Sequence, residues 1–304
     1  MKMRRSLGEH LFDKFNVIFM IVMSIIMVYP FWYILCLAFN TGADAARGPI
    51  WFFPRDFTLE NFKYVFRYPN IPQAAFITVA RCIAAPVFSV TVNMLAAFTL
   101  SKRWLPFRKL IVFFLMGPMF IGGTVVSNYL VMAKLGLLNN FLVFVIPGAF
   151  GYFNALIMRS SIDGLPPELQ ESAFLDGAGY GTIFFRIILP LSKPVIAAFL
   201  FFSVVANWLD LGTNLLYITK KSLYTLQWIM YLAINSTEAK NIIIDPRNRN
   251  TAQQIAEMAK QSATPTPQVI RMAILVVVTF PILFVYPFFQ KYFVKGMLTG
   301  SVKA

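Results

Sequence analysis

Long apolar runs separated by polar segments set the hydropathy pattern of this chain. Each run comes close to the length of about 20 apolar residues that a helix needs to cross the hydrocarbon core of a bilayer. The pattern predicts an all-α integral membrane protein with six transmembrane helices, at about residues 17–39, 74–100, 110–131, 140–158, 195–217 and 269–289.

The polar segments between these runs predict which side of the membrane each one faces. Residues 102–109 hold two lysines and two arginines in a short turn, and such basic turns stay in the cytoplasm. The central polar segment 160–193 then lies on the same side, whereas the long segments 40–73 and 218–268 lie outside. Both termini, including the tail 290–304, are expected in the cytoplasm.

Breaks within the runs indicate an internal pathway. The third run is interrupted by Gly117-Pro118 and again by Gly122-Gly123. Such breaks are tolerated where neighbouring protein groups or water satisfy the freed backbone groups. The first run is unlike these, since it is uninterrupted except for Pro30, too long for a signal-peptide core and without an obvious cleavage site. We expect it to be an uncleaved first span.

Composition agrees with one transmembrane domain over residues 1–304. Only 13% of the residues are charged and 58% are hydrophobic, against about a quarter charged in a typical soluble domain. The net charge of +14 does not indicate nucleic-acid binding, because the basic residues are spread among the ends of the apolar runs.

The residues that carry most enzyme chemistry are scarce. His10 is the only histidine, and Cys36 and Cys82 both fall within apolar runs, where we interpret them as buried thiols and give a disulfide less weight. The chain holds no phosphate loop of the form GxxxxGK[ST] and no HExxH. We therefore expect no metal site, no cofactor and no enzymatic activity in this chain, so that any use of ATP requires another subunit.

The central polar segment predicts two short helices. The first begins near Pro167, with Glu168 and Glu171 in its first turn, where the helix dipole favours negative charge. Gly177 and Gly179 are expected to end it, since glycine accepts the left-handed conformation of many helix ends.

A second helix follows in the same segment. We expect Thr182 to cap it and the helix to run toward Ile187, with Pro190 closing or bending it.

This segment resembles the EAA loop of permease subunits of ABC importers. Glu171-Ser172-Ala173 is followed after three residues by Gly177 and after nine more by Ile187-x-Leu189-Pro190, with Ser172 where the family usually has alanine. The resemblance implies a type I ABC importer permease fold, in which this loop fits a cleft of an ATP-hydrolysing subunit. The coupling residues it implies are Glu171, Ser172, Ala173, Asp176, Gly177, Ile187, Leu189 and Pro190. The alternative is an ordinary amphipathic cytoplasmic loop.

The resemblance extends over essentially the whole chain and is strongest to the carbohydrate-uptake branch, in the group that includes maltose-type permeases and permeases for complex oligosaccharides. The segments that carry it are residues 5–9, 57–62, 136–138, 147–149 and 290–296. The resemblance also implies that the tail reaches an ATPase dimer, with Lys295, Gly296, Gly300 and Lys303 as contacts. A flexible basic terminus is the alternative.

A bacterial cell-membrane importer follows from this resemblance, one that moves an oligosaccharide by ATP-driven alternating access. Its partners would be a second permease, two subunits that bind ATP and Mg²⁺, and a lipid-anchored or periplasmic sugar-binding protein. The alternatives are an importer of an amino acid or phosphate, a passive channel and, against the scarcity of catalytic residues, a membrane-embedded enzyme.

Polar residues within the runs are candidates for the substrate pathway. Asn207, Asp210 and Asn214 are spaced to share one face of the fifth predicted helix, next to Trp208. A carboxylate in a span is costly unless it faces protein or water, so Asp210 serves the pathway, lies at the interface near the outer end of the helix, or pairs with Arg81 or Arg271. Further candidates are Tyr152, Asn154, Asn128, Tyr129 and Asn93. Buried asparagines also bridge helices, which is the alternative for each of them.

The two external segments are expected to hold short helices. Thr58 is placed to cap a helix beginning within residues 57–62, and residues 250–262 form a second amphipathic pattern. The aromatic residues around Trp51 indicate either a docking surface for an external protein or an anchor at the lipid–water interface.

Overall fold

The computed structural model describes residues 7–67, 70–235 and 266–301, and it divides the chain into two compact units. Unit 1 comprises the residues up to 68 together with 232–279, and unit 2 comprises 69–231 together with 280–304. The predicted helix at 250–262 lies outside the described residues, as does Lys303.

Unit 1 is built on the long helix α1 (Leu7–Ala38) and the first part of α16 (Pro267–Ser301). Cys36 and Leu37 at the end of α1 pack with Ile50 and Val269 in a buried apolar cluster. Two short helices follow α1, α2 (Gly42–Ala45) and α3 (Glu60–Arg67).

The first external segment is tied to the end of α1 by hydrogen bonds. The Asn61 amide donates to the carbonyl oxygens of Ala38 and Asn40, at 2.8 Å each. The Thr58 hydroxyl accepts from the Glu60 N–H at 3.1 Å and so satisfies one N–H of the first turn, but the N-cap position is Leu59, whose carbonyl oxygen accepts from Lys63 N–H. In this loop the Asn40 amide, with the help of Arg55, holds the pKa of Asp44 below its usual value.

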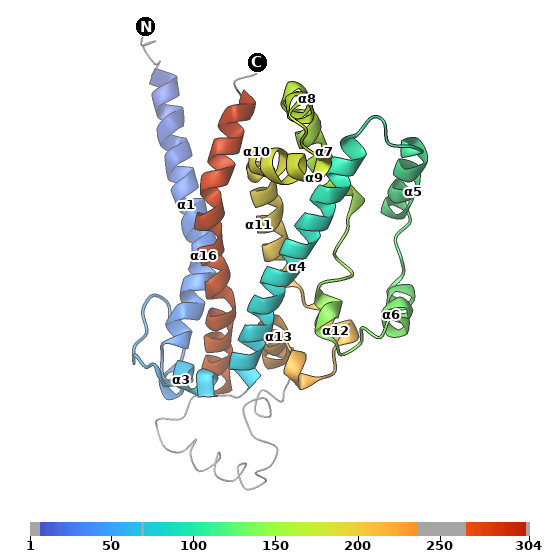
Figure 1. Ribbon diagram of the computed structural model, residues 1–304. Coiled ribbons are helices and arrows are strands. Elements are labelled where there is room, and N and C mark those ends of the chain that lie inside the picture. Colours follow the sequence, from blue (N-terminus) through green and yellow to red (C-terminus); the bar gives the residue numbers. More distant parts are fainter. Residues whose placement is uncertain (1–6, 68–69, 236–265, 302–304) are drawn as a thin grey trace. The chain divides into compact units, whose positions relative to one another are not determined.

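Unit 2 is organised around the long helix α4 (Asn70–Ser101), which packs against α7 (Tyr152–Asp163) and α11 (Lys193–Leu209), as Figure 1 shows. On the far side of α7 from α11 the chain forms α5 (Arg108–Phe120) and α6 (Val125–Lys134). The remaining elements are η1 (Phe141–Phe144), α8 (Glu168–Leu175), α9 (Tyr180–Ile183), a π-helical turn η2 (Phe184–Ile188), α10 (Leu189–Leu191), α12 (Gly212–Tyr217), η3 (Lys221–Leu223) and α13 (Leu226–Asn235).

Among the described residues, three helices are long and apolar enough to cross a membrane, at Leu11–Ala38, Asn70–Ser101 and Pro267–Phe289. Two bent helix pairs raise the number to five if each counts as one span. The first pair, α5 and α6, bends by 119° where Gly122 and Gly123 interrupt the run, at one of the predicted breaks. The second pair joins Tyr180–Leu191 to α11 with a bend of 76°.

Two expected helices differ from the observed ones. The fourth run, 140–158, does not form one helix, because η1 ends at Phe144 and α7 begins only after Gly151. Pro147, Gly148 and Gly151 leave the chain between them irregular, and α7 continues beyond the predicted end to Asp163. The fifth run, 195–217, is also divided, since α11 ends at Leu209 and α12 starts at Gly212.

The C-terminal tail is not irregular over its described part. The backbone of α16 stays helical through Ser301, so Lys295, Gly296 and Gly300 belong to a helix that continues the sixth run. Contact of this tail with an ATPase dimer stays a prediction, as does the alternative of a flexible basic terminus.

Candidate functional site

The first short helix of the central polar segment forms as predicted. α8 begins after Pro167, and Glu168 and Glu171 lie in its first turn. Gly177 has a φ of 78°, the left-handed conformation expected of it. The Gly177 N–H donates to Phe174 O at 3.0 Å and the Ala178 N–H to Ala173 O at 2.9 Å. This pair of bonds is a Schellman motif, which satisfies the last carbonyl groups of α8 and fixes the direction in which the chain leaves.

The second short helix differs from the prediction. Gly179, with extended backbone at φ −75° and ψ 166°, is its N-cap, whereas Thr182 lies inside α9 and caps nothing. The prediction of Thr182 is wrong because the tight turn after Gly177 starts the next helix three residues earlier than a Thr182 cap requires. Pro190 does not close the helix either; it sits at the start of α10, and the bend follows at Ser192.

The residues implied by the EAA resemblance divide into an exposed and a packed group. Glu171, Ser172, Asp176 and Gly177 are exposed on α8 and its end. Ala173, Ile187 and Leu189 instead pack against a buried cluster that includes Met94, Ile183 and Ile188. The segment thus rests on an apolar base and presents its polar side outward; Pro190 is exposed.

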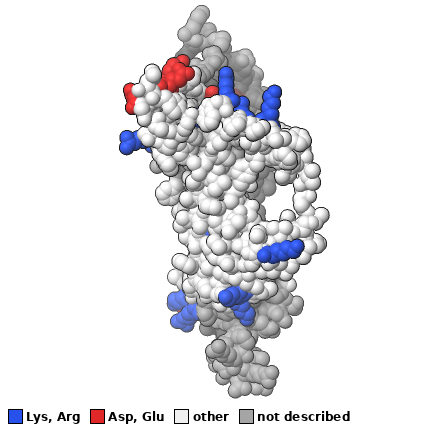
Figure 2. Space-filling view, turned by 45° about the vertical axis from the view of Figure 1, so that its right-hand side comes forward, with Lys and Arg blue, Asp and Glu red and all other residues white. Residues whose placement is uncertain are grey.

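Three apolar side chains of α8 are exposed. Leu175 is 90% exposed, and Leu169 and Phe174 are each 40% exposed. Figure 2 shows acidic and basic side chains gathered at the end of unit 2 that carries α8, while the face beyond it carries few charges. Several exposed apolar side chains on one short helix, beside charged side chains, are typical of protein contact surfaces.

A second set of contacts joins α8 to the end of α4. Lys102 donates a hydrogen bond to the Gln170 side chain and lies 4.1 Å from the centroid of the Phe98 ring. The Tyr180 ring lies 5.5 Å from that of Trp104 and 5.0 Å from that of Phe174, measured between centroids. Burial lowers the pKa of Lys102, and the charge of Asp163 opposes this shift. α8 is therefore fixed to the turn after α4 as well as to the chain on either side of it.

The predicted pathway face on the fifth helix does not form. The helix breaks at Asp210, so Asn214 lies on a different helix from Asn207 and the two do not share a face. Asp210 pairs with Arg81 of α4, the structural alternative named for it, and Arg81 also lies 4.6 Å from the centroid of the Phe144 ring. The buried Asn214 donates to Leu223 O and accepts from the Thr225 hydroxyl.

The remaining pathway candidates lie in several places. Asn207 donates to Ser203 O within α11, and Trp208 is buried. Tyr152 is buried at the start of α7, whereas Asn128 is exposed on α6, and the ring of Tyr129 stacks on that of Tyr217. Asn93 bridges α4 to the irregular chain before α7, accepting from Gly151 N–H at 3.1 Å and donating to Ala149 O at 3.2 Å.

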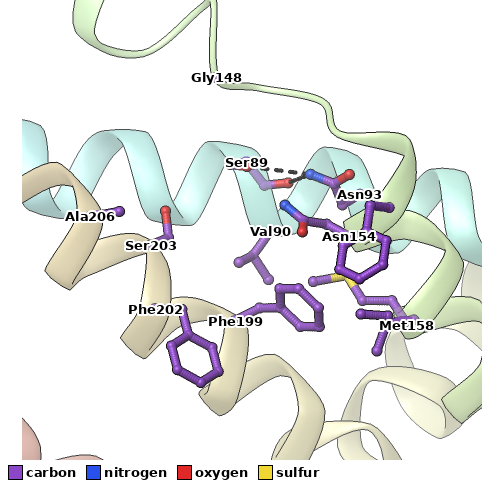
Figure 3. A pocket seen from close by; sticks show the side chains of 12 residues that line it. Ser89, Val90, Asn93, Gly148, Asn154, Met158, Phe199, Phe202, Ser203 and Ala206 are labelled. Atoms are coloured by element: carbon purple, nitrogen blue, oxygen red, sulfur yellow. Dashed lines mark hydrogen bonds between the residues drawn. The ribbon is translucent and has the colours of Figure 1, made fainter. Parts of the chain in front are cut away.

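One pathway candidate, Asn154, lines a cavity between α4, α7 and α11, shown in Figure 3. The cavity has a volume of about 470 Å³, within the range of small-molecule sites. Its walls carry the hydroxyl groups of Ser89 and Ser203 and the rings of Phe153, Phe199 and Phe202.

Sequence reasoning missed most of this lining. Phe199, Phe202 and Ser203 are spaced three and four residues apart, so they share one face of α11. That spacing is visible in the sequence, but no charged residue marks this face, whereas Asp210 marks the other end of the helix.

A larger cavity of about 910 Å³ lies beneath α8. Its lining is strongly charged and includes Lys102, Arg103, Arg108, Arg159 and Glu171. Arg159 pairs with Asp163 at 3.1 Å. No cluster of three or more histidine, cysteine or acidic side chains suited to a metal ion occurs among the described residues, and both cysteines are buried free thiols.

Comparison with known proteins places the chain in a family. A family model described as "Binding-protein-dependent transport system inner membrane component" matches residues 3–299. The chain is 35% identical to Protein LplC of Bacillus subtilis over 301 residues, covering 99% of this chain and 98% of that protein. It is 32% identical to the polygalacturonan/rhamnogalacturonan transport system permease protein YtcP of the same organism, covering 97% and 99%.

A solved structure has the same fold. A chain of a bacterial ABC transporter involved in the import of the acidic polysaccharide alginate matches with a TM-score of 0.85 at 22% identity, covering 95% of this chain and 99% of that one.

Proposed function

The chain belongs to the family of binding-protein-dependent transport system inner membrane components, and from this premise we propose that it is a permease subunit that moves an oligosaccharide inward by alternating access. The observation that carries the sugar assignment is the likeness to the polygalacturonan/rhamnogalacturonan permease over 97% of the chain. The fold shared with the alginate transporter agrees with it.

In this proposal α8 and its flanking residues are the element that receives force. Its exposed side, with Leu175 at the tip, enters a cleft of an ATP-hydrolysing subunit, and its inner side transmits movement to the apolar cluster beneath it. The Schellman motif at Gly177 keeps the two short helices at a fixed angle, so that a push on α8 moves the segment as a body. The exposed Glu171 and Asp176 are the polar contacts of this docking side.

The complete machine in this proposal contains subunits that this chain does not supply. A second permease completes the pathway, two ATPase subunits bind ATP and Mg²⁺, and a binding protein delivers the sugar to the outer side. The chain crosses the membrane six times with both termini inside, with the irregular segment before α7 as part of the fourth crossing. In that arrangement the helical tail at Lys295, Gly296 and Gly300 points toward the ATPase subunits.

Transport by the reconstituted complex tests this proposal. We expect uptake of oligosaccharides into vesicles to require ATP, the ATPase subunits and the binding protein together. Uptake that persists without ATP would indicate a channel, and stimulation of the ATPase by an amino acid or phosphate, with no response to any sugar, would indicate a different cargo.

A further inference from the structure

The cavity between α4, α7 and α11 contains a polar group with nothing to bind. Asn154 is half-buried, and its side chain makes no hydrogen bond with any described residue. Figure 3 shows its amide directed into the cavity, between Asn93 and the ring of Phe199. An amide without partners in an apolar setting loses free energy relative to water, so this group favours a ligand or a water molecule that bonds to it.

The neighbouring asparagine provides an internal comparison. Asn93 on α4 donates to Ser89 O at 2.8 Å and to Ala149 O, and it accepts from Gly151 N–H. Its hydrogen-bonding capacity is used in holding the irregular chain, so it is a structural residue. Asn154 lies against the same cavity with both its donor and its acceptor unused by the described residues.

The rest of the lining suits a sugar ring. Phe202 is 62% exposed and Phe153 is 54% exposed, and both residues line the cavity. The Ser203 hydroxyl on α11 points toward α4 in Figure 3. Aromatic surface combined with a few convergent hydrogen-bonding groups matches a saccharide, which has an apolar C–H face and a rim of hydroxyl groups.

Charge decides which kind of sugar fits. None of the twelve residues that line the cavity is Lys, Arg, His, Asp or Glu. Arg81, about two turns before Ser89 on α4, is already paired with Asp210 and packed on Phe144. A carboxylate placed here would lose its hydration without gaining a cation, which is costly, whereas hydroxyl groups would not suffer this penalty.

We propose that this cavity is a subsite on the transport pathway for one uncharged saccharide unit, in which Asn154 and Ser203 bind hydroxyl groups and Phe202 supports the ring. The subsite selects neutral sugars over uronates. This deepens the proposed function and rests on it. The cavity would thus differ in preference from the acidic polysaccharides named for two of the similar proteins.

The proposed selectivity for neutral sugars is tested by placing a positively charged side chain in the cavity. In vesicles with the complete complex, we expect the unmodified protein to take up neutral oligosaccharides at least tenfold better than uronate oligosaccharides of equal length. Ser203→Arg places a guanidinium, which binds carboxylates in a bidentate manner, against the cavity. It should shift the ratio of uptake at least tenfold toward the uronates.

The second part of the test removes the side-chain groups that are proposed to bind the sugar. Asn154→Leu and Phe202→Ala should each lower the uptake of neutral oligosaccharides about tenfold while the complex still assembles. Matched controls are Thr91→Val and Phe76→Ala, which remove a hydroxyl and an exposed ring from α4 outside the cavity. Both should transport normally. If Asn154→Leu does not assemble, Phe202→Tyr, which keeps the ring, should restore the uptake lost in Phe202→Ala.

Failure of the subsite and failure of the importer are distinguishable. Equal uptake of neutral and acidic sugars by the unmodified protein, with no shift in Ser203→Arg, overturns the subsite while leaving sugar import intact. Absence of uptake of either sugar, together with ATP-dependent uptake of another solute, overturns the proposed function as well.

Discussion

Two regions of unit 2 rest on the same apolar cluster but make opposite use of it. They are the central polar segment, residues 160–193, proposed above as the coupling segment, and the cavity between α4, α7 and α11. The segment covers the cluster with Ile183, Phe184 and Ile188 and directs its charged side chains away. The cavity instead opens beside Val90 and Met158 of the same cluster and carries no charge. A charged, protruding surface suits a protein partner, whereas an uncharged recess suits a small molecule, so the two regions are fitted to different ligands while sharing one support.

Loss of the ion pair between Arg81 of α4 and Asp210 at the end of α11 has the largest expected effect. Asp210→Ala leaves the buried guanidinium of Arg81 without its carboxylate, which should destabilise the protein by about 3 kcal/mol or more. Its melting temperature in detergent should fall by several degrees, whereas the double variant Arg81→Leu/Asp210→Leu should recover much of the loss. A normal melting temperature combined with failed uptake would instead make Asp210 a pathway residue.

A strained residue at position 177 should disrupt the turn in the coupling segment and leave the cavity unchanged. Gly177→Val puts a β-branched residue at a φ of 78°, which costs roughly 1–2 kcal/mol and favours loss of the Schellman turn. We expect sugar-stimulated ATPase activity to fall about tenfold while the permease still folds. Gly181→Val is the matched control, since Gly181 lies in α9 with ordinary helical backbone and open space around it. Full stimulation in the Gly177 variant would contradict the role given to this turn.

Removal of the exposed apolar tip tests the segment as a docking surface. Leu175 is 90% exposed, so Leu175→Ser should leave the melting temperature unchanged and weaken copurification of the ATPase subunits several-fold. Leu135→Ser, at a leucine 61% exposed at the end of α6, serves as the control. Equal retention of the ATPase subunits by both variants would remove Leu175 from the interface.

The smallest expected effect concerns pH. Because burial lowers the pKa of Lys102, the unfolded chain binds that proton more tightly than the folded one. Stability should therefore rise slightly with pH between the lowered pKa and the ordinary value of 10.5, and remain level below this window. Melting temperatures measured from pH 8 to pH 10.5 should show a rise that Lys102→Met lacks. The same rise in both proteins would assign it to other groups.

Local backbone chemistry explains which parts of the coupling segment were predictable from sequence. Pro167, the two glutamates of the first turn and Gly177 act within a few residues, so their roles could be predicted and are confirmed. The N-cap of the second helix could not be predicted in this way, because its position depends on the geometry of the turn at Gly177. Thr182 lies beyond the residue at which that turn starts the helix.

The pathway was harder to predict because it depends on packing between distant elements. Asp210 looked functional as long as the fifth run was taken for one helix, and only the break at Leu209 shows it pairing with Arg81, more than a hundred residues away. In the same way, nothing local separates Asn93 from Asn154. Their difference arises from the irregular chain at Ala149 and Gly151, which bonds to the first and leaves the second open.

The position of Val90 and Met158 has a thermodynamic consequence. Both belong to the wall of the cavity and to the cluster beneath the coupling segment, and closely packed interiors resist compression. In the proposed function, an occupant that displaces this wall would therefore change the affinity of the α8 surface for its partner. By linkage, the partner would change the affinity of the cavity by the same factor, and the sugar and the ATPase subunit would act as each other's effector through two side chains.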